Sequence, residues 1–290
     1  MYPYDGRFYA QAKALVRSQR GWLKPLLVLA AAAFVPVVGP LAALGYCLEY
    51  ARLVAWGVDA APKQKNVQVG ACIKAGWRGV VAGLGATALS ILIELALTYV
   101  FGNQSGFAGF FSTLIGMFCV TISCVCAVHA AVYQNYRVGY KRRVRDMITT
   151  DFRSVIRITC IYMLLSLGIG LVVGLFFSFV IGGMIQDLAR YAPLLTYTDT
   201  LETMTMRDML GILAQFVSLA SPYAPGIAIG IFLLSLGNAY AELILNLCVG
   251  IWFRRFDVPN WRSMDDPLPP RVMPVTPQLP PSQFPPQSRQ

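Results

Sequence analysis

The sequence predicts an all-α polytopic integral membrane protein with six transmembrane helices arranged as three helical hairpins. Hydrophobic residues make up 56% of the chain and charged residues 13%, which leaves too little polar surface to coat a soluble globule. The apolar residues form runs of about membrane-spanning length. The Lys and Arg residues, which give a formal net charge of +10, cluster in short segments between these runs, where such residues orient membrane helices.

The six predicted spans share one domain, residues 21–256. We place them at about 22–38, 40–58, 77–101, 107–134, 158–185 and 226–253. The first two are separated at Val38-Gly39-Pro40, because glycine and proline both interrupt a helix. Pro40 suits the first turn of the second span, where its missing N–H would have no partner. The uncharged segment 102–106 turns the third span directly into the fourth.

Both ends of the chain are predicted to lie outside the spans. Residues 1–20 place Phe8, Tyr9 and Leu15 at helical spacing among basic residues, which fits either an amphipathic helix at the membrane interface or a solvated tail. Residues 257–290 contain ten of the eighteen prolines, so we expect a disordered, Pro-rich cytoplasmic tail. Its segment 267–271 resembles a polyproline ligand for a protein partner, the alternative being a simple tether.

The distribution of Lys and Arg predicts the orientation of the spans. If the N-terminus is cytoplasmic, every Lys and Arg except Arg190 and Arg207 falls in a cytoplasmic segment, as the positive-inside rule requires. An odd number of spans would break this separation. We therefore expect a multi-pass protein of the cell membrane with both termini in the cytoplasm. Acidic lipid, and not nucleic acid, is then the expected counter-charge.

Several short motifs, most of them in the first hairpin, carry a family resemblance. They are Trp22-Leu23-Lys24, the apolar run into Val37-Val38-Gly39-Pro40, Leu44-Gly45-Tyr46, Arg52, Gly57 and Gly76. With these motifs the chain resembles the DUF4013 family of uncharacterised polytopic membrane proteins, up to about Arg255. It departs from the family in the loop 59–75, where Ala61-Pro62-Lys63 replaces a Leu-Pro-x-Trp segment. The resemblance implies a multi-pass membrane protein, with no catalytic residue to carry over.

Charged and strongly polar residues inside the predicted spans are few. Each needs a physical reason, because a charge at mid-bilayer costs several kcal/mol unless it is shielded. Glu49 and Arg52 lie three residues apart on one helical face, which predicts an internal ion pair. The candidates in the other spans, each within a polar stripe at helical spacing, are Glu94, His129, Asn238, Glu242 and Asn246.

Two hypotheses explain these polar stripes. In the first, G-x-x-x-G motifs let helices approach closely at the bundle centre, and polar groups bond across helices. The motifs are Gly79/Gly83, Gly170/Gly174 and Gly226/Gly230. In the second, Glu94, Glu242 and His129 line a solvated path for a proton, an ion or a small polar solute.

The sequence predicts no enzyme, metal site or cofactor. His129 is the only histidine, so the usual general base is absent from every other position. A metal site at Cys124, Cys126 and His129 is not expected, because cysteines two apart on a helix point to nearly opposite faces. A carboxylate pair formed by Glu94 and Glu242 is the remaining enzymatic alternative.

The most densely charged segment, residues 137–157, predicts an amphipathic helix on the membrane surface. Its cations attract anionic head groups by about 1 kcal/mol each, unless they serve only to orient the spans. The candidates to face anionic lipid are Lys141, Arg142, Arg143, Arg145, Arg153 and Arg157.

The sequence therefore favours a non-enzymatic scaffold or accessory protein. Such a protein would engage anionic lipid or partner proteins through its basic cytoplasmic face. The alternative is a small-solute, ion- or proton-coupled permease that uses Glu94 and Glu242 within the membrane.

Overall fold

The computed structural model describes residues 7–18, 21–62, 68–101, 106–134, 142–195, 214, 218 and 221–258. Every regular element in these ranges is a helix, as the sequence predicts. The helices are α1 (Phe8–Arg17), α2 (Leu23–Ala32), α3 (Val38–Ala55), α4 (Val69–Phe101), α5 (Gly106–Tyr133), α6 (Arg142–Thr150), α7 (Phe152–Leu195), the short 3-10 helix η3 (Ser221–Tyr223) and α9 (Ala224–Arg254). The predicted Pro-rich tail lies outside the described residues except for Asp257 and Val258.

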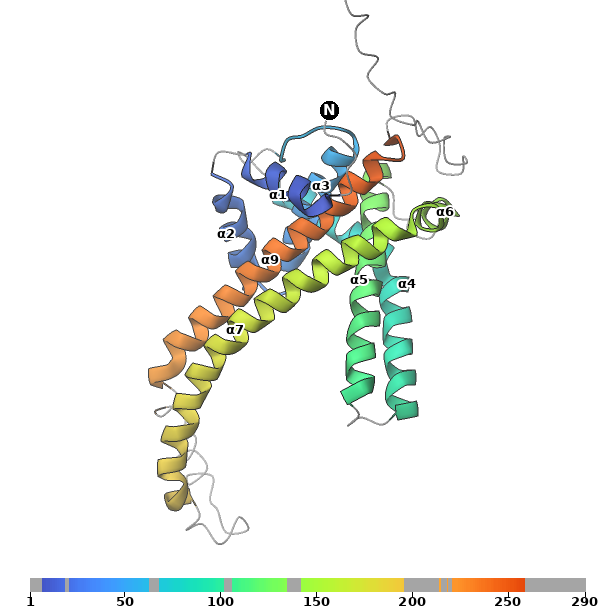
Figure 1. Cartoon of the computed structure of the whole chain (residues 1–290). Coiled ribbons are helices and arrows are strands. Elements are labelled where there is room, and N and C mark those ends of the chain that lie inside the picture. Colours follow the sequence, from blue (N-terminus) through green and yellow to red (C-terminus); the bar gives the residue numbers. More distant parts are fainter. Residues whose placement is uncertain are drawn as a thin grey trace, which may run out of the picture.

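Four of the described helical segments are long and apolar enough to cross a membrane. They are Val69–Phe101, Gly109–Tyr133, Phe152–Asp187 and Ser221–Arg254. These segments correspond to the predicted third, fourth, fifth and sixth spans. The structure thus has the helices of an integral membrane protein, and it arranges them as two antiparallel pairs, α4 with α5 and α7 with α9, that diverge from a common end (Figure 1).

The predicted first hairpin differs from the expectation, so six spans are not confirmed. In place of the first predicted span, residues 22–38, the structure has the shorter helix α2. Its 10 residues extend about 15 Å, half of the hydrocarbon thickness of about 30 Å. The chain turns at residues 33–37, where Val37 has a φ of 66°, and Gly39 and Pro40 lie inside α3. In Figure 1 the α2–α3 hairpin ends well short of the far ends of the two long pairs.

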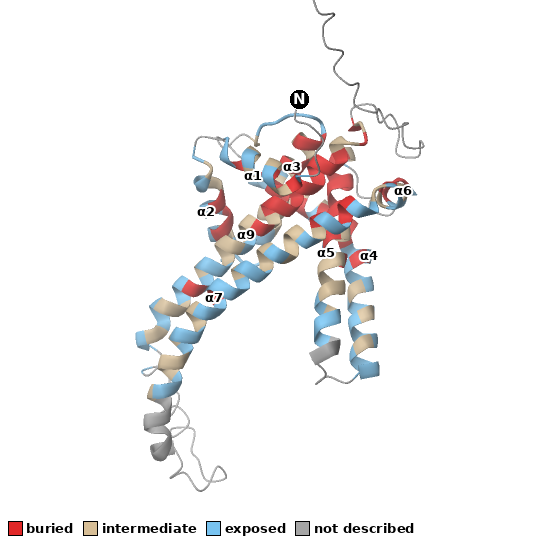
Figure 2. Ribbon diagram, viewed as in Figure 1, coloured by how far each residue is buried: buried red, intermediate tan, exposed pale blue. Residues whose placement is uncertain are grey.

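The buried core lies at the end of the molecule where the two pairs meet (Figure 2). Its largest fully buried side chains include Trp252 and Phe253 of α9, Leu48 of α3 and Phe8 of α1. The predicted N-terminal amphipathic segment therefore forms a helix, and α1 buries its apolar face against protein, with the guanidinium of Arg255 4.5 Å from the centre of the Phe8 ring.

Beyond the core, the two pairs expose apolar side chains. Leu92 and Leu95 of α4 are 63% and 61% exposed, and Leu171 and Phe179 of α7 are 58% and 82% exposed. A water-soluble protein rarely exposes so many large apolar side chains along the same helices. Lipid chains solvate such surfaces, and this exposure agrees with membrane-spanning helices.

Glycines set the closest helix contacts. A Cβ atom added to Gly45 of α3 would overlap the carbonyl oxygen of Cys72, and one added to Gly76 of α4 would overlap the carbonyl oxygen of Leu41. The sequence predicts a similar role for Gly170/Gly174. That prediction is wrong for the described residues, because both glycines of α7 face open space.

Candidate functional site

A cavity of about 430 Å³ lies where α4, α5, α7 and α9 meet. Its lining is mostly apolar, and we call it the polar cavity after the set of polar groups that it also contains. Helix α3 contributes Leu44 to its lining. The polar residues that line it are Thr87 and Ser90 of α4, Ser123 and Cys124 of α5, Tyr162 of α7, and Asn238, Glu242 and Asn246 of α9. Because it brings together a carboxyl, two amides and several hydroxyl groups, this polar cavity is the candidate functional site.

The α9 side of the cavity carries its carboxyl and both amides. Asn238, Glu242 and Asn246 are four residues apart in sequence, so they share one face of the helix. The amide of Asn246 donates to the Glu242 backbone carbonyl at 2.9 Å, and the thiol of Cys124 donates to the Asn246 side-chain oxygen at 3.5 Å. Asn246 is only 1% exposed and links α9 to α5, whereas Glu242 keeps partial access to the cavity.

On the side formed by α4 and α5, two of the lining hydroxyl groups share one acceptor, the backbone carbonyl of Gly83. The hydroxyl groups of Thr87 and Ser123 both donate to the Gly83 carbonyl, at 3.2 Å and 3.5 Å. A Cβ atom at Gly83 would overlap the Ser123 hydroxyl, so the glycine permits this approach of α4 and α5. The predicted G-x-x-x-G contact at Gly79/Gly83 is therefore present.

The cavity offers hydrogen-bonding groups without a cation. None of the residues that line it is Lys or Arg, so an ionised Glu242 has no basic partner among them. An isolated charge in such surroundings is costly. Binding of a proton, a small cation or a small polar solute at Glu242 would lower that cost. Glu242 lies about 18 Å along α9 from Arg254, at 1.5 Å per residue.

The structure does not bring Glu94 and His129 to Glu242. Glu94 is exposed on the outer half of α4, where the two pairs have diverged, and it does not line the cavity. His129 is fully buried in the core, where its ring lies 5.2 Å from the Tyr133 ring and 6.2 Å from the Phe253 ring. The two carboxyl groups therefore do not form the pair considered from the sequence.

The ion pair predicted between Glu49 and Arg52 is present. The Arg52 guanidinium donates twice to the Glu49 carboxylate, at 2.9 Å and 2.5 Å, within α3. Both side chains are partly exposed, 24% for Arg52 and 36% for Glu49. They offset each other's charge and do not line the polar cavity.

Tyr162 is the cavity residue that the sequence reasoning missed. It lies in the apolar run of α7 and reaches the cavity beside Asn238 and Glu242. A single tyrosine inside a span, four residues before Ser166, is the only sequence signal that could have indicated it.

The predicted lipid-facing arginines fall into two groups. Arg142, Arg145, Arg153 and Arg157 are exposed; we call these four the basic face. Arg143 is the exception, since it is 3% exposed. It turns inward, with its guanidinium donating to the Tyr133 hydroxyl and 5.9 Å from the centre of that ring. Lys141 lies outside the described residues.

Neither a metal site nor a match to a known protein helps to assign the function of the polar cavity. Among the described residues, no group of three or more His, Cys, Asp and Glu side chains could hold a metal ion, and all seven cysteines are free. Comparison of the chain with family models, with curated proteins and with solved structures found no match. The resemblance to the DUF4013 family stays a prediction.

Proposed function

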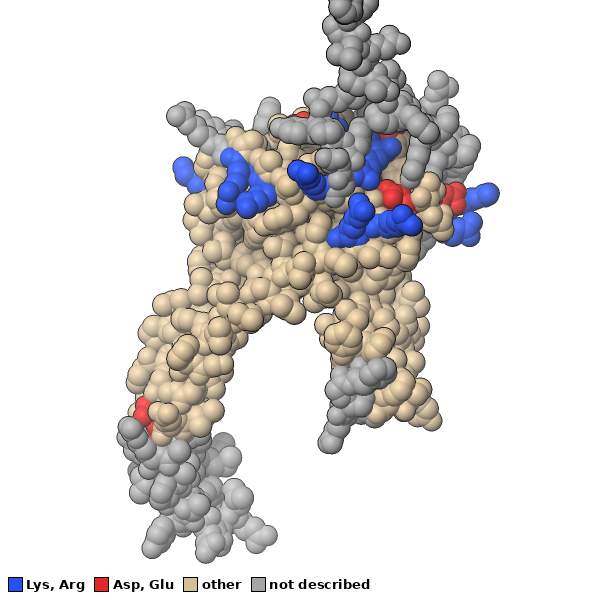
Figure 3. Space-filling view, in the orientation of Figure 1, with Lys and Arg blue, Asp and Glu red and all other residues tan. Residues whose placement is uncertain are grey.

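We propose that the chain is a non-enzymatic membrane scaffold or accessory protein that engages anionic lipid through its basic face. The observation that supports this proposal is the separation of charge in space. In Figure 3 the Lys and Arg side chains gather at the core end of the molecule, whereas the described surface of the two diverging pairs carries none in this view. Cations near an anionic surface each contribute about 1 kcal/mol to association.

The basic face lies on α6 and on the first turns of α7, and both helices are anchored to the core. Figure 1 views α6 nearly along its axis while α4 and α5 run in the plane of the picture, so α6 lies across the bundle. Val144 and Met147 of α6 are buried. At the junction of α6 and α7, Asp151 accepts a hydrogen bond from the Trp252 indole at 3.2 Å and pairs with Arg255 at 3.5 Å.

The proposal includes the predicted orientation in the cell membrane. With α4, α5, α7 and α9 crossing the bilayer, an even number of crossings keeps both termini on the side of the basic face. The positive-inside rule makes that side the cytoplasm. The Pro-rich tail would then be available to a cytoplasmic protein partner.

Lipid selectivity tests the proposal. The purified full-length protein is placed in phosphatidylcholine vesicles, and the association of spin-labelled phosphatidylglycerol is compared with that of spin-labelled phosphatidylcholine. We expect the wild type to prefer the anionic lipid and the variant Arg153→Gln/Arg157→Gln to lose part of that preference. The control Arg153→Lys/Arg157→Lys retains both charges and should retain the preference. Equal association of the two lipids with the wild type would contradict the proposal.

The polar cavity supports a second candidate function, a permease for protons or small polar solutes. The carboxyl group in the cavity belongs to Glu242, far along α9 from its cytoplasmic end. Glu94, which the sequence also suggested for a permease, has no role in this candidate function. In proteoliposomes, Glu242→Gln should reduce proton or small-cation flux, while Glu94→Gln should leave it unchanged. If Glu242→Gln has the same flux as the wild type, this second candidate is wrong.

A further inference from the structure

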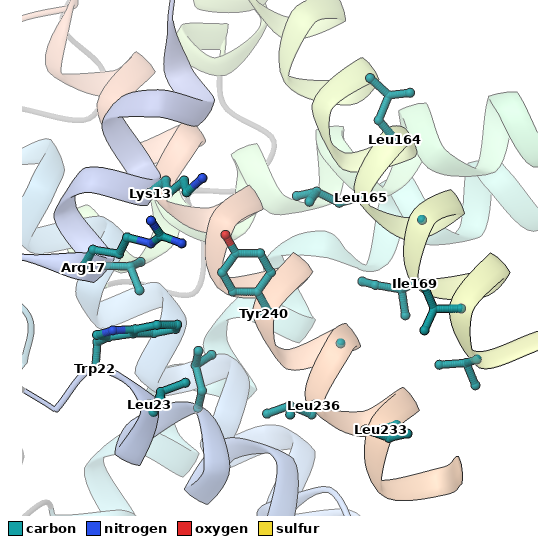
Figure 4. Close-up of a pocket in the computed structure, with 16 residues that line it drawn as sticks. Lys13, Arg17, Trp22, Leu23, Leu164, Leu165, Ile169, Leu233, Leu236 and Tyr240 are labelled. Carbon is teal, nitrogen blue, oxygen red and sulfur yellow. The ribbon is translucent and has the colours of Figure 1, made fainter. Parts of the chain in front are cut away.

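An amphipathic groove of about 590 Å³ lies between α1, α2, α7 and α9, apart from both the basic face and the polar cavity. Figure 4 shows its two ends. Lys13, Arg17, Trp22 and the hydroxyl group of Tyr240 lie toward one end. Apolar side chains line the rest, among them Leu164, Leu165, Ile169, Leu233 and Leu236. The volume falls in the range of about 300–1,000 Å³ that small-molecule sites occupy.

The polar end has an excess of positive charge. Lys13 and Arg17 are four residues apart, so they lie on the same face of α1. Arg17 is exposed and Lys13 is half-buried. In the part of the chain that the structure describes, neither cation pairs with a carboxylate. The Lys13 ammonium lies 5.8 Å from the centre of the Tyr9 ring. The charge at this end is complementary to an anionic group.

The apolar end opens sideways toward the lipid-facing surface. Leu164 of α7 is 66% exposed and Leu233 of α9 is 38% exposed. Gly168 contributes to the lining without a side chain, and the space beside it is empty to 4 Å. An acyl chain could therefore enter this end directly from the bilayer.

We propose that the groove binds one anionic phospholipid. Its phosphate lies against Lys13 and Arg17, and one acyl chain runs along the apolar strip of α7 and α9. Trp22 and the hydroxyl group of Tyr240 border the same end of the groove as the two cations and offer polar tips to the head group. Charge complementarity at one end and lateral access at the other together favour a lipid over a soluble anion or a peptide. The inference rests on the membrane placement proposed above, but not on the basic face.

Retention of lipid by the purified full-length protein tests the inference. The protein is extracted in mild detergent, delipidated, and titrated with phosphatidylglycerol or phosphatidylcholine, with bound lipid counted by native mass spectrometry. We expect one phosphatidylglycerol to bind preferentially, and Lys13→Gln/Arg17→Gln to weaken that binding by about tenfold. The variant Arg153→Gln/Arg157→Gln should bind this single lipid like the wild type, which separates the groove from the basic face.

A second pair of variants keeps the test independent of the cations. Gly168→Leu places a side chain in the empty part of the groove, and it should weaken binding of the single lipid while Lys13 and Arg17 remain. Gly174→Leu adds the same side chain to α7 in open space outside the groove and should have no effect. Thermal unfolding midpoints near that of the wild type establish that each variant is folded.

Three outcomes would overturn the inference. The first is equal binding of phosphatidylcholine and phosphatidylglycerol by the wild type. The second is unchanged binding of the single lipid in both Lys13→Gln/Arg17→Gln and Gly168→Leu. The third is displacement of the bound lipid by inorganic phosphate alone, which would identify a site for a soluble anion. A failure of the basic-face proposal would instead appear in vesicles, as equal association of the two lipids with the wild type or as an unchanged preference in Arg153→Gln/Arg157→Gln.

Discussion

The contact between α3 and α4 depends on two glycines that face each other's backbone. Any side chain at Gly45 or Gly76 would meet a backbone carbonyl oxygen of the other helix. A rotamer change cannot relieve such an overlap, because the obstacle is main chain. Both glycines belong to the motifs that carry the family resemblance, so the sequence identifies the residues but not the contact that requires them.

Gly76→Ala should therefore destabilise the fold. We expect a loss of about 1–3 kcal/mol, the range typical of overpacking, seen as a lower thermal unfolding midpoint in detergent. Gly174→Ala is the matched control, because its added methyl group meets no atom within 4 Å. An equal effect of the two substitutions would contradict the close α3–α4 contact.

Asp151 connects three elements through its carboxylate. It accepts from the Trp252 indole and pairs with Arg255 at the end of α9, while it separates α6 from α7. Asp151→Ala leaves the fully buried indole N–H without this acceptor, and such a loss costs about 1–3 kcal/mol. We expect a matching decrease in unfolding free energy.

Asp146→Ala provides the comparison. Asp146 pairs with Arg142 at 3.8 Å and Arg145 at 3.9 Å on the exposed side of α6. Exposed pairs contribute about 0–1 kcal/mol, so this substitution should change stability little. If Asp146→Ala costs more than Asp151→Ala, the junction at Asp151 does not hold the basic face.

Glu94, Glu242 and Arg143 show which side-chain positions the sequence analysis did not predict. Glu94 and Glu242 both lie in polar stripes, but only Glu242 lines the cavity, because the α4/α5 pair has left the bundle by the level of Glu94. Arg143 lies among four arginines that face outward and yet bonds inward to Tyr133. The difference between the two glutamates has no local signal, since it depends on how whole helices are placed. Arg143 does have one, because it precedes the buried Met147 by four residues and so shares the buried face of α6.

At the scale of the elements, run length identifies the four long helices but not the α2–α3 hairpin. Residues 33–37 are Ala-Phe-Val-Pro-Val, so the chain turns without any polar residue. The turn places β-branched Val37 at a φ of 66°, which is rare outside glycine. The backbone N–H groups of Phe34 and Val35 keep hydrogen bonds to the carbonyls of Ala31 and Ala32, at 3.1 Å and 2.9 Å, as backbone groups away from water require. Because every side chain of the turn is apolar, hydropathy alone cannot distinguish it from a continuing span.

Chemical accessibility distinguishes a half-length hairpin from two full spans. In a chain whose seven native cysteines are replaced by serine, Val35→Cys should fail to react with a membrane-impermeant maleimide from either side of the membrane, because α2 reaches only about half the bilayer depth. Thr149→Cys on α6 serves as the reactive control once the cytoplasmic side is exposed. Reaction of the Val35 cysteine from outside intact cells would restore the predicted six spans.

At the scale of the whole molecule, polar and apolar surfaces are separated along the long helices. The buried core and the cations share one end (Figures 2 and 3), and exposed large apolar side chains continue along the rest of α4, α7 and α9. This arrangement follows from composition and could be predicted, because each basic segment adjoins the end of an apolar run. The divergence of the two helix pairs could not be predicted from the sequence, since it depends on side-chain packing between helices that are distant in sequence.

Two cysteine variants test this separation most directly, each made in a chain whose seven native cysteines are replaced by serine. Gly106→Cys lies at the start of α5, and Thr149→Cys lies on α6 beside the basic face. With an impermeant maleimide, we expect Gly106→Cys to react in intact cells and Thr149→Cys to react only after the membrane is permeabilised. Reaction of both cysteines from the same compartment would contradict the membrane arrangement on which the lipid and permease proposals depend.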